Sequence, residues 1–424
     1  MNAAFRLAYE GAGQLARALA GLAPASSNKL VETFALRRGI VDRYEAFERD
    51  GAAPLLWMHA PSVGEGLQAW PVIELVNERR PTTQVAYTYF SPSARQFAAK
   101  LPVDFSDALP FDATSDMRRA LAALSPTALV FSKLDVWPTL AREASNRGTH
   151  LGLVSATLAR GSSRRTGLAG ALLRDAYARL NLVGAISADD ADRLVALGVP
   201  PSRVRVTGDT RYDQVWARAR AIDRASSLLL PLTNDRPTLV AGSTWPADEA
   251  IVLPAWSRVA SQIPGVRLII AAHEPTEGHI VPIEQWAASA GLRAARLSDQ
   301  LARDADVIVV DRVGVLGDLY ALATIAFVGG GFHAAGLHSV LEPAAYGAPV
   351  LFGPCHTASR DAQLLLDADA AACVSDSAEL ADALRRFLTS SSDRSSAGDA
   401  ALQVVHLGLG AAERSYAIVA ELLG

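Results

Sequence analysis

Short apolar runs alternate with amphipathic stretches from residue 54 onward, and this alternation restricts the possible folds more than any other feature of the chain. In the first half, the apolar runs lie at residues 55–59, 84–88, 128–131, 150–154, 182–186 and 204–207. After a break, they resume at residues 238–241, 266–271, 307–310, 325–328, 350–352 and 371–374. Strands that alternate with helices are typical of parallel sheets built from βαβ units. The pattern predicts an α/β protein with two doubly wound, Rossmann-like domains.

The break and the two ends of the chain divide it into five segments. We expect a helical segment at 1–40, an N-terminal domain at 41–214, a linker at 215–236, a C-terminal domain at 237–399 and a C-terminal helix at 400–424. The Ser-rich stretch at 390–398 is typical of a flexible loop. Doubly wound sheets bind ligands at the carboxyl ends of their strands, so we expect a ligand cleft where the two domains face each other.

The composition excludes several classes of protein. Half of the 424 residues are hydrophobic, a fifth are charged and the net charge is −4, which argues against a nucleic-acid partner. The two cysteines, Cys355 and Cys373, lack metal-ligand spacing and fit a reducing cytoplasm. The acids and histidines are not paired either, so we expect no metal site. No run of 18 apolar residues predicts a transmembrane helix, and Arg6 and Glu10 interrupt any secretory signal.

Residues 3–22 show helical periodicity with one apolar face. That face carries Leu7, Ala8, Leu15, Ala18, Leu19 and Leu22, with Phe5 at its edge, whereas Arg6, Glu10 and Arg17 lie opposite. Such a helix can lie on a membrane interface, and the nearby Arg37, Arg38 and Arg43 can meet anionic lipid. The alternative is a helix that packs on its own domain, with the three arginines on a solvated face.

The glycine-rich segment at 327–354 is the strongest local indication of function. An apolar strand runs into three glycines at 329–331, and we expect a helix to start near His338, to carry Glu342 one turn in and to end at Gly347. Glycines let a backbone approach a ligand, and a helix N-terminus suits a phosphate. A carboxylate one turn in can accept hydrogen bonds from a ribose. The segment therefore predicts a nucleotide site, although such turns also occur for purely structural reasons.

Two strand ends of the N-terminal domain carry candidate functional groups. Ser62 and Gly64 belong to a tight turn whose N–H groups can point at an anion, and Glu65 falls in the first turn of the next helix. Glu65 can serve as a general base, or it can be an acid that stabilises the helix start. Lys133 and Asp135 follow another strand, where they can face the cleft or form a salt bridge beside a buried Trp137.

The C-terminal domain repeats this arrangement. Ser243 and Thr244 follow its first strand and can bind an oxyanion or cap the next helix. His273 follows the next apolar strand and can point into the cleft or be structural. Gly314 lies at a helix start, where it would let a nucleotide approach the backbone.

Taken in order, these segments resemble the 3-deoxy-D-manno-octulosonic acid (Kdo) transferases of lipopolysaccharide synthesis, which have the GT-B fold. The resemblance runs from about residue 30 to the C-terminus. It rests on HAPSVGE at 59–65, YTYFSPSAR at 87–95, KLDVWP at 133–138, VTGDTRYD at 206–213, GSTWPADE at 242–249, AAHEP at 271–275 and GLHSVLEPAAYGAPVLFGP at 336–354.

The resemblance implies an inverting transfer of Kdo from CMP-Kdo to a glucosamine 6′-hydroxyl of a lipid A precursor, without a metal or cofactor. It implies that Glu65 is the general base. The implied donor contacts are His273, Gly314, Gly336, His338, Ser339 and Glu342. It also implies a peripheral enzyme on the cytoplasmic side of the bacterial inner membrane.

The chain departs from the family pattern at several positions. Ala272 stands where Arg or Lys is common, Val315 replaces an acid and Lys133 replaces Glu. Leu337 and Ser339 replace Gly and Asn. These changes indicate a divergent branch. Two alternatives are a GT-B transferase that uses a UDP-sugar with a lipid-linked acceptor, and a non-catalytic nucleotide-sugar-binding protein of the cell envelope.

Overall fold

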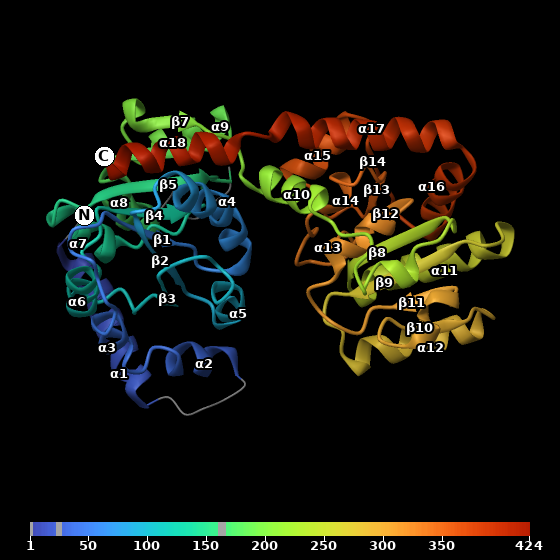
Figure 1. The fold of residues 1–424 in the computed structure, drawn as a ribbon, viewed down its shortest axis with the longest axis horizontal. Helices are drawn as coiled ribbons and strands as arrows, with labels where there is room; N and C mark the ends of the chain where they lie inside the picture. Colours follow the sequence, from blue (N-terminus) through green and yellow to red (C-terminus); the bar gives the residue numbers. More distant parts are fainter. Residues whose placement is uncertain (1–2, 23–27, 160–166) are drawn as a thin grey trace. The chain divides into compact units, whose positions relative to one another are not determined.

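The computed structural model describes residues 3–22, 28–159 and 167–424. The chain forms two compact units, of which the first comprises Met1–Gln214 with Gly408–Gly424 and the second comprises Val215–Leu407. Within the described ranges, each unit contains one seven-stranded sheet whose paired strands are parallel (Figure 1). The predicted fold class, α/β with two doubly wound sheets, is confirmed.

The strand order in the first sheet is β3-β2-β1-β4-β5-β6-β7. The strands are β1 Leu55–His59, β2 Gln84–Tyr89, β3 Phe105–Ala108, β4 Ala128–Ser132, β5 His150–Ala156, β6 Leu182–Ala185 and β7 Val204–Val206. The direction of winding reverses between β1 and β4, whose register pairs His59 with Phe131. The carboxyl ends of these two strands therefore open at the switch point, where ligands of such sheets bind.

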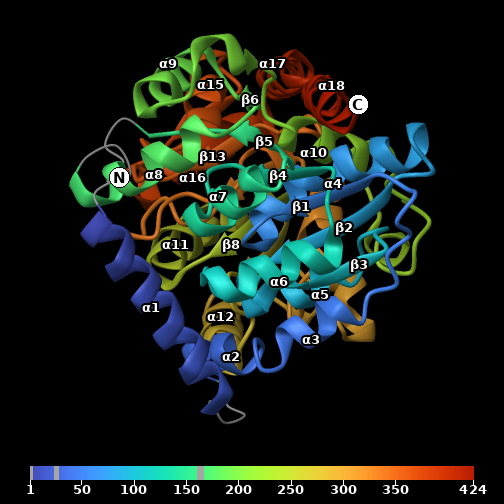
Figure 2. The same ribbon diagram turned by 90° about the vertical axis from the view of Figure 1, so that its left-hand side faces the viewer.

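Helices cover both faces of this sheet. Helices α4 (Val63–Arg79), α5 (Arg95–Ala98) and α18 (Ala411–Leu423) pack on one face, and Figure 2 shows α18 beside α4. The other face carries α6 (Thr114–Leu124), α7 (Pro138–Asn146), α8 (Gly167–Ala178) and α9 (Ala188–Leu197). The remaining elements of this part of the chain are α1 Ala3–Leu22, α2 Lys29–Ala35, α3 Ile40–Glu45, η1 Pro92–Ala94, η3 Pro201–Arg203 and α10 Arg211–Arg220.

The C-terminal region differs from the prediction. The expected single helix at 400–424 is two helices, α17 (Ser391–Gly408) and α18, which are separated by Gly410 at φ 82°. Of the expected flexible loop at 390–398, residues 391–398 are helical and form the start of α17. Ala397, Ala401 and Val405 recur four residues apart on α17 and are buried, so packing overrides the loop-like composition.

The second sheet has the strand order β10-β11-β9-β8-β12-β13-β14. Its strands are β8 Thr238–Thr244, β9 Arg267–Ala272, β10 Ala294–Arg296, β11 Val307–Val309, β12 Ile325–Val328, β13 Val350–Phe352 and β14 Ala371–Cys373. Winding reverses between β8 and β12, whose register pairs Val328 with Gly242. The segments that follow these two strands, 243–249 and 329–340, thus meet at the second switch point.

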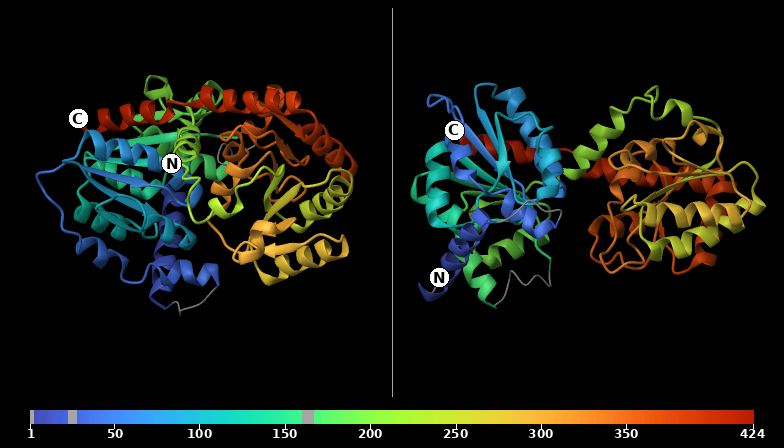
Figure 3. Two further views of the ribbon diagram at one scale, coloured as in Figure 1. Left: turned by 45° about the vertical axis from the view of Figure 1, so that its right-hand side comes forward. Right: turned by 90° about the horizontal axis from the view of Figure 1, so that it is seen from below.

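Two hydrophobic clusters enclose this sheet. One contains residues of α11 (Pro246–Gln262), α12 (Glu277–Ser289) and α16 (Ser377–Thr389). The ribbons of these helices can be followed by their colours, from yellow-green to red, in Figure 3. The other contains residues of η4 (Leu230–Leu232), η5 (Gln300–Asp304), α13 (Leu316–Leu319) and η6 (Tyr320–Leu322). Leu229 and Leu232 of the segment expected to be a linker are buried in this second cluster. The short helices α14 (Leu341–Ala344) and α15 (Arg360–Asp367) complete the unit.

Candidate functional site

The carboxylate of Glu65 lies just after the carboxyl end of β1. Helix α4 begins at Val63, so Glu65 falls in its first turn, as predicted. The Nζ atom of Lys133 lies 3.0 Å from Oε1 of Glu65, and the Ser62 hydroxyl donates to Oε2. Burial acts to raise the pKa of Glu65, but the Ser62 hydrogen bond and the Lys133 ammonium together hold that pKa below its ordinary value. The carboxylate is thus ionised near neutral pH, as a general base requires.

Close packing positions this turn. A Cβ atom at Gly66 would lie 2.7 Å from the Tyr87 hydroxyl, so the glycine lets α4 approach the sheet. The Ser132 hydroxyl donates to the carbonyl of Glu65 at 3.0 Å. Lys133 follows Ser132 with φ 68°, a left-handed conformation that is uncommon for a residue with a side chain. That turn of the backbone directs the ammonium to Glu65.

The other predicted residues of the first unit are neighbours of Glu65 and Lys133 in the sequence. Gly64 is exposed in the first turn of α4, and Asp135 lies half-buried in the loop between β4 and α7. The side chain of Lys133 is 42% exposed, which leaves the ammonium partly open to a ligand. Trp137 stacks on Phe90 with ring centroids 5.0 Å apart.

The glycine-rich loop after β12 is held by one buried carboxylate. Asp248, in the first turn of α11, accepts hydrogen bonds from the backbone N–H groups of Gly330 at 2.7 Å and Phe332 at 3.0 Å. It also accepts one from the N–H of Trp245 at 2.9 Å. Two N–H groups of the loop are thus used inside the protein, so they are not available to a phosphate.

The helix after this loop begins later than predicted. We expected a start near His338, but α14 comprises only Leu341–Ala344, and His338 and Ser339 precede it. Pro343 explains the difference, because in a longer helix it would remove the hydrogen bond to the carbonyl of Ser339 and its ring would clash there. The helix N-terminus that we expected at His338 and Ser339 is therefore absent from this described segment.

Four aromatic rings stack at the second switch point instead. The ring of Trp245 stacks on His333 at a centroid distance of 4.2 Å and on His273 at 4.4 Å. His273 also stacks on His338 at 4.7 Å. These residues follow three neighbouring strands, β8, β9 and β12, so the parallel sheet brings their side chains to one edge. The stack unites two predicted donor residues, His273 and His338, with two that sequence reasoning missed.

Glu342 lies in the first turn of α14 and is half-buried. Among the described residues, its carboxylate has no hydrogen-bond or ion-pair partner. Burial raises the pKa of Glu342, and the guanidinium of Arg218 opposes that rise. Arg218 itself pairs with Asp318 at 2.9 Å. Glu342 thus retains acceptor atoms that can meet the hydroxyls of a ligand.

The remaining predicted residues of the second unit lie on the loops of the same sheet edge. Gly314 and Gly336 adopt φ values of 86° and 87°, which favour glycine. Ser243 has φ 55° at the end of β8, and the Thr244 hydroxyl donates to Glu249 at 3.0 Å. Thr244 is therefore occupied within the protein, whereas Ser243 remains half-buried beside the loop.

Comparison with known proteins identifies the family. A family model described as 3-Deoxy-D-manno-octulosonic-acid transferase (kdotransferase) matches residues 34–214. The 3-deoxy-D-manno-octulosonic acid transferase of Bordetella pertussis is 30% identical over 399 residues, which cover 89% of this chain and 91% of that protein. The chain belongs to the Kdo transferase family. The Haemophilus influenzae Kdo transferase is 25% identical over 389 residues, covering 89% of this chain and 90% of that protein.

Solved structures agree on the fold. A putative UDP-N-acetylglucosamine 2-epimerase from Listeria monocytogenes superimposes with a TM-score of 0.63 and 12% identity, covering 88% of this chain and 96% of that one. A glycosyltransferase from Rickettsia africae gives a TM-score of 0.60 and 9% identity, covering 88% and 99%. At this identity the likeness concerns the fold alone. The GT-B fold expected from the resemblance is confirmed, and the Kdo transferase is a glycosyltransferase.

Three residues that contact or belong to the glycine-rich loop and its ring stack escaped prediction as functional groups: Trp245, Asp248 and His333. Asp248 was visible only as an acid at a helix start, which is a common pattern. A clearer signal existed for Trp245, because a Trp-Pro pair begins both α7 and α11. His333 had no local signal, since its contact with Trp245 arises only when β8 and β12 pair.

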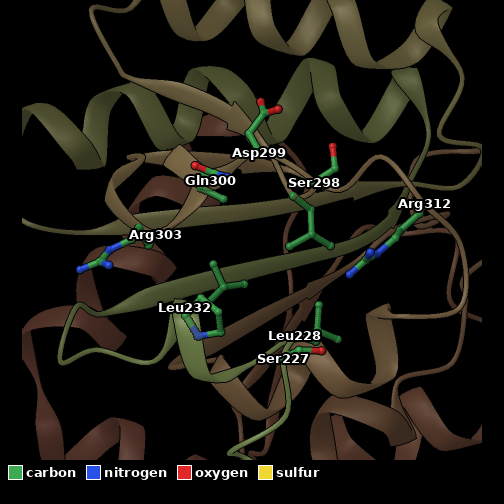
Figure 4. Close-up of a pocket in the computed structure, with 11 residues that line it drawn as sticks. Ser227, Leu228, Leu232, Ser298, Asp299, Gln300, Arg303 and Arg312 are labelled. Atoms are coloured by element: carbon green, nitrogen blue, oxygen red, sulfur yellow. The ribbon is translucent and has the colours of Figure 1, made fainter.

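A separate hollow of about 330 Å³ lies beside η4 and η5 of the Kdo transferase. Its lining includes the apolar side chains of Leu228, Leu232 and Leu297, and Figure 4 shows Arg303 and Arg312 on opposite sides of it. It adjoins the ends of β10 and β11 rather than the switch point, and none of the predicted site residues lines it.

Proposed function

We propose that this Kdo transferase moves Kdo from CMP-Kdo to the 6′-hydroxyl of a glucosamine in a lipid A precursor, with inversion at the anomeric carbon. The observation that carries this proposal is the position of the Glu65 carboxylate, which Lys133 and Ser62 hold at a switch point. Both contacts lower the pKa of Glu65. An inverting displacement needs a base that takes the proton of the acceptor hydroxyl as the new bond forms. Glu65 has the charge and the position for that role.

The second unit provides the donor contacts in this proposal. His273, His338 and Ser339 follow β9 and β12 and present side chains that suit anionic oxygens. Glu342 accepts hydrogen bonds from ribose hydroxyls, while Gly314 and Gly336 let the nucleotide approach the backbone. Because CMP leaves with a single phosphate, the reaction proceeds without a metal or another cofactor.

Further ligand contacts come from residues around Glu65 and at the end of β8. The partly exposed ammonium of Lys133 suits an anionic group of the acceptor, with Ser62, Gly64 and Asp135 around it. Ser243 is the corresponding candidate at the end of β8 in the second unit, and the buried Thr244 next to it, whose hydroxyl donates to Glu249, supports that strand end from within the protein.

Helix α1 supports attachment to the cytoplasmic face of the inner membrane. Among the described residues, no helix has the length and apolarity to cross a bilayer. Tyr9 donates to Asp112 at 2.8 Å and Arg17 pairs with Asp116 at 3.0 Å, so these polar groups face the first unit. Leu15 and Leu19 are 63% and 46% exposed. Their side chains can enter the lipid headgroup region, which suits an enzyme with an amphiphilic acceptor. The side chains of Phe5, Leu7 and Leu22 lie outside the described residues.

The test uses purified wild-type enzyme with CMP-Kdo and a tetra-acylated lipid A precursor, and mass spectrometry detects the Kdo adduct. Glu65→Gln should lose product by several orders of magnitude because its amide cannot accept the proton. Glu74→Gln, which alters an exposed acid on the same helix, should retain wild-type activity. Equal product from the two variants would remove Glu65 from the mechanism.

Donor identity is tested separately by thermal-shift titration. CMP should stabilise the wild-type protein at lower concentrations than UDP, since ligand binding raises the apparent stability. A preference for UDP would instead support a UDP-sugar transferase. Binding of CMP-Kdo without turnover would support a non-catalytic nucleotide-sugar-binding protein.

A further inference from the structure

Each unit contains a tryptophan whose indole N–H donates to a strand-end or loop histidine. Trp137 Nε1 lies 3.0 Å from Nε2 of His59, and Trp245 Nε1 lies 3.3 Å from Nε2 of His338. Both tryptophans occupy the N-cap position of a helix and precede a proline. The two units thus build the same Trp–His pair from the same local sequence.

The indole N–H fixes the tautomer of its partner. Indole can only donate a hydrogen bond, so the Nε2 atom that it meets must offer a lone pair. A neutral imidazole with a lone pair on Nε2 carries its proton on Nδ1. A doubly protonated imidazole also carries a proton on Nε2, and that N–H group would face the indole N–H. The contact with the indole therefore also disfavours the imidazolium cation.

In the Trp137–His59 pair, both ring nitrogens of the histidine have hydrogen-bond partners. Its ring is fully buried, and Nδ1 lies 3.0 Å from the hydroxyl oxygen of Thr88, which accepts the Nδ1 proton. Burial lowers the pKa of His59 to about 3, although Glu65 acts in the opposite direction. Both ring nitrogens are used within the first unit, so His59 is structural.

His338 differs in one respect, because its Nδ1 atom has no hydrogen-bond partner among the described residues. The ring is half-buried and stacks on His273. The backbone N–H of His338 donates to the carbonyl of Gly329 at 3.1 Å, which holds the residue against the glycine-rich loop. The indole that caps Nε2 is itself fixed, since His333 lies parallel to it within 6°. The Nδ1–H group is therefore oriented but available.

The charged neighbours of His338 favour its neutral form. Burial and the adjacent His273 lower the pKa of His338, and His333 acts in the same direction. The Asp248 carboxylate opposes them, but its two oxygens are bonded to the backbone N–H groups of Trp245, Gly330 and Phe332.

We propose that Trp245 is a positioning residue that fixes His338 as the neutral Nδ1–H tautomer, so that His338 donates one hydrogen bond from Nδ1 to an anionic oxygen of the sugar nucleotide. His338 then binds the sugar nucleotide through an uncharged N–H group and not through a positive charge. The identity of the ligand rests on the proposed function, whereas the tautomer does not depend on it.

The tautomer is read directly by long-range proton–nitrogen NMR on ¹⁵N-histidine-labelled enzyme without substrate, with His338→Gln to assign the signal. At pH 7, Nε2 of His338 should give the shift of an unprotonated ring nitrogen and Nδ1 that of an N–H. In Trp245→Phe, which keeps the ring stack, the Nε2–H tautomer or the cation should appear. Trp286→Phe, at a distant indole that donates to Ser257, should leave the signal unchanged. An Nε2–H tautomer in the wild type would overturn the proposal even if Trp245→Phe failed to fold.

The use of Nδ1 is tested by kinetics with CMP-Kdo. The amide nitrogen of asparagine can replace Nδ1, whereas that of glutamine replaces Nε2. His338→Asn should keep kcat/KM within about 10-fold of wild type, and His338→Gln should lose roughly 10- to 100-fold more, as expected for a hydrogen bond to a charged group. Equal losses in the two variants would refute a contact through Nδ1. A wild-type enzyme inactive with CMP-Kdo would contradict the proposed function but leave the NMR result intact.

Discussion

Replacing Asp248 by asparagine should weaken the second unit more than its small chemical change suggests. Asp248 has no exposed surface. Its Oδ2 atom accepts from the N–H groups of Trp245 at 2.9 Å and Gly330 at 2.7 Å, and its Oδ1 atom accepts from Phe332 at 3.0 Å. One carboxylate thus joins the start of α11 to the glycine-rich loop.

The size of the effect follows from these three bonds. The single carbonyl oxygen of asparagine can retain the two N–H groups at Oδ2, but its NH₂ group then faces the N–H of Phe332. One charge-assisted bond is lost and a largely buried N–H is left unpaired, which together should cost about 3 kcal/mol. For a unit of this size that corresponds to a fall of roughly 6–12 °C in the melting temperature.

Differential scanning calorimetry measures this change, with Asp376→Asn as the matched control. Asp376 caps α16 through one oxygen, Oδ1, which accepts from both Ala378 and Glu379. An amide oxygen can keep both of those bonds, so the melting temperature of this variant should equal that of the wild type. The displaced loop of Asp248→Asn should also raise the KM for the donor. If the two variants have the same melting temperature and the same KM for the sugar-nucleotide donor, the assigned role of Asp248 is wrong.

Three further predictions concern other contacts. Lys133→Met removes an ammonium that lowers the pKa of Glu65, so that pKa should rise and the acidic limb of the kcat/KM profile should move to higher pH; an unmoved limb would contradict this. Gly242→Ala places a methyl group against the Tyr320 hydroxyl and should destabilise the protein by about 1–3 kcal/mol in denaturant titrations, with partial recovery in the double variant with Tyr320→Phe. Arg37→Lys should cost about 2–4 kcal/mol by the same measurement, because the buried guanidinium donates to three backbone carbonyls that one ammonium cannot reach together; wild-type stability would refute that reading.

The sequence predicted the sheet cores well because buried parallel strands are continuous apolar runs. The runs at 55–59 and 325–328 coincide with β1 and β12. The strands that it missed, β3 (Phe105–Ala108) and β10 (Ala294–Arg296), lie at sheet edges and are only partly buried. Edge strands need fewer apolar residues, so periodicity reveals only some of them: the other two edge strands, β7 and β14, coincide with the predicted runs at 204–207 and 371–374.

The local part of the site was equally predictable. Glu65 was expected in the first turn of a helix after a strand, and it lies there, because strand, turn and helix start are all properties of a short segment. The Trp245–His338 hydrogen bond joins residues 93 positions apart. Such contacts depend on which strands become neighbours, and strand order is not encoded in any single segment. The late start of α14 was readable in principle, since Pro343 marks it.

Helix α18 has a consequence for the order in which the chain matures during synthesis. It belongs to the first unit, yet the whole second unit precedes it in the chain. Leu422 fills the space beside Gly152 on β5, and Ile418 lies against Gly184 on β6. The sheet of residues 55–206 leaves the ribosome with that surface uncovered and must wait for residues 411–423. The second unit, in contrast, is one continuous segment and can complete its core first. During synthesis, the second unit can therefore complete its fold before the first unit, although the first unit begins earlier in the chain. Until α18 is made, the uncovered face of β5 and β6 is an apolar surface to which a chaperone can bind.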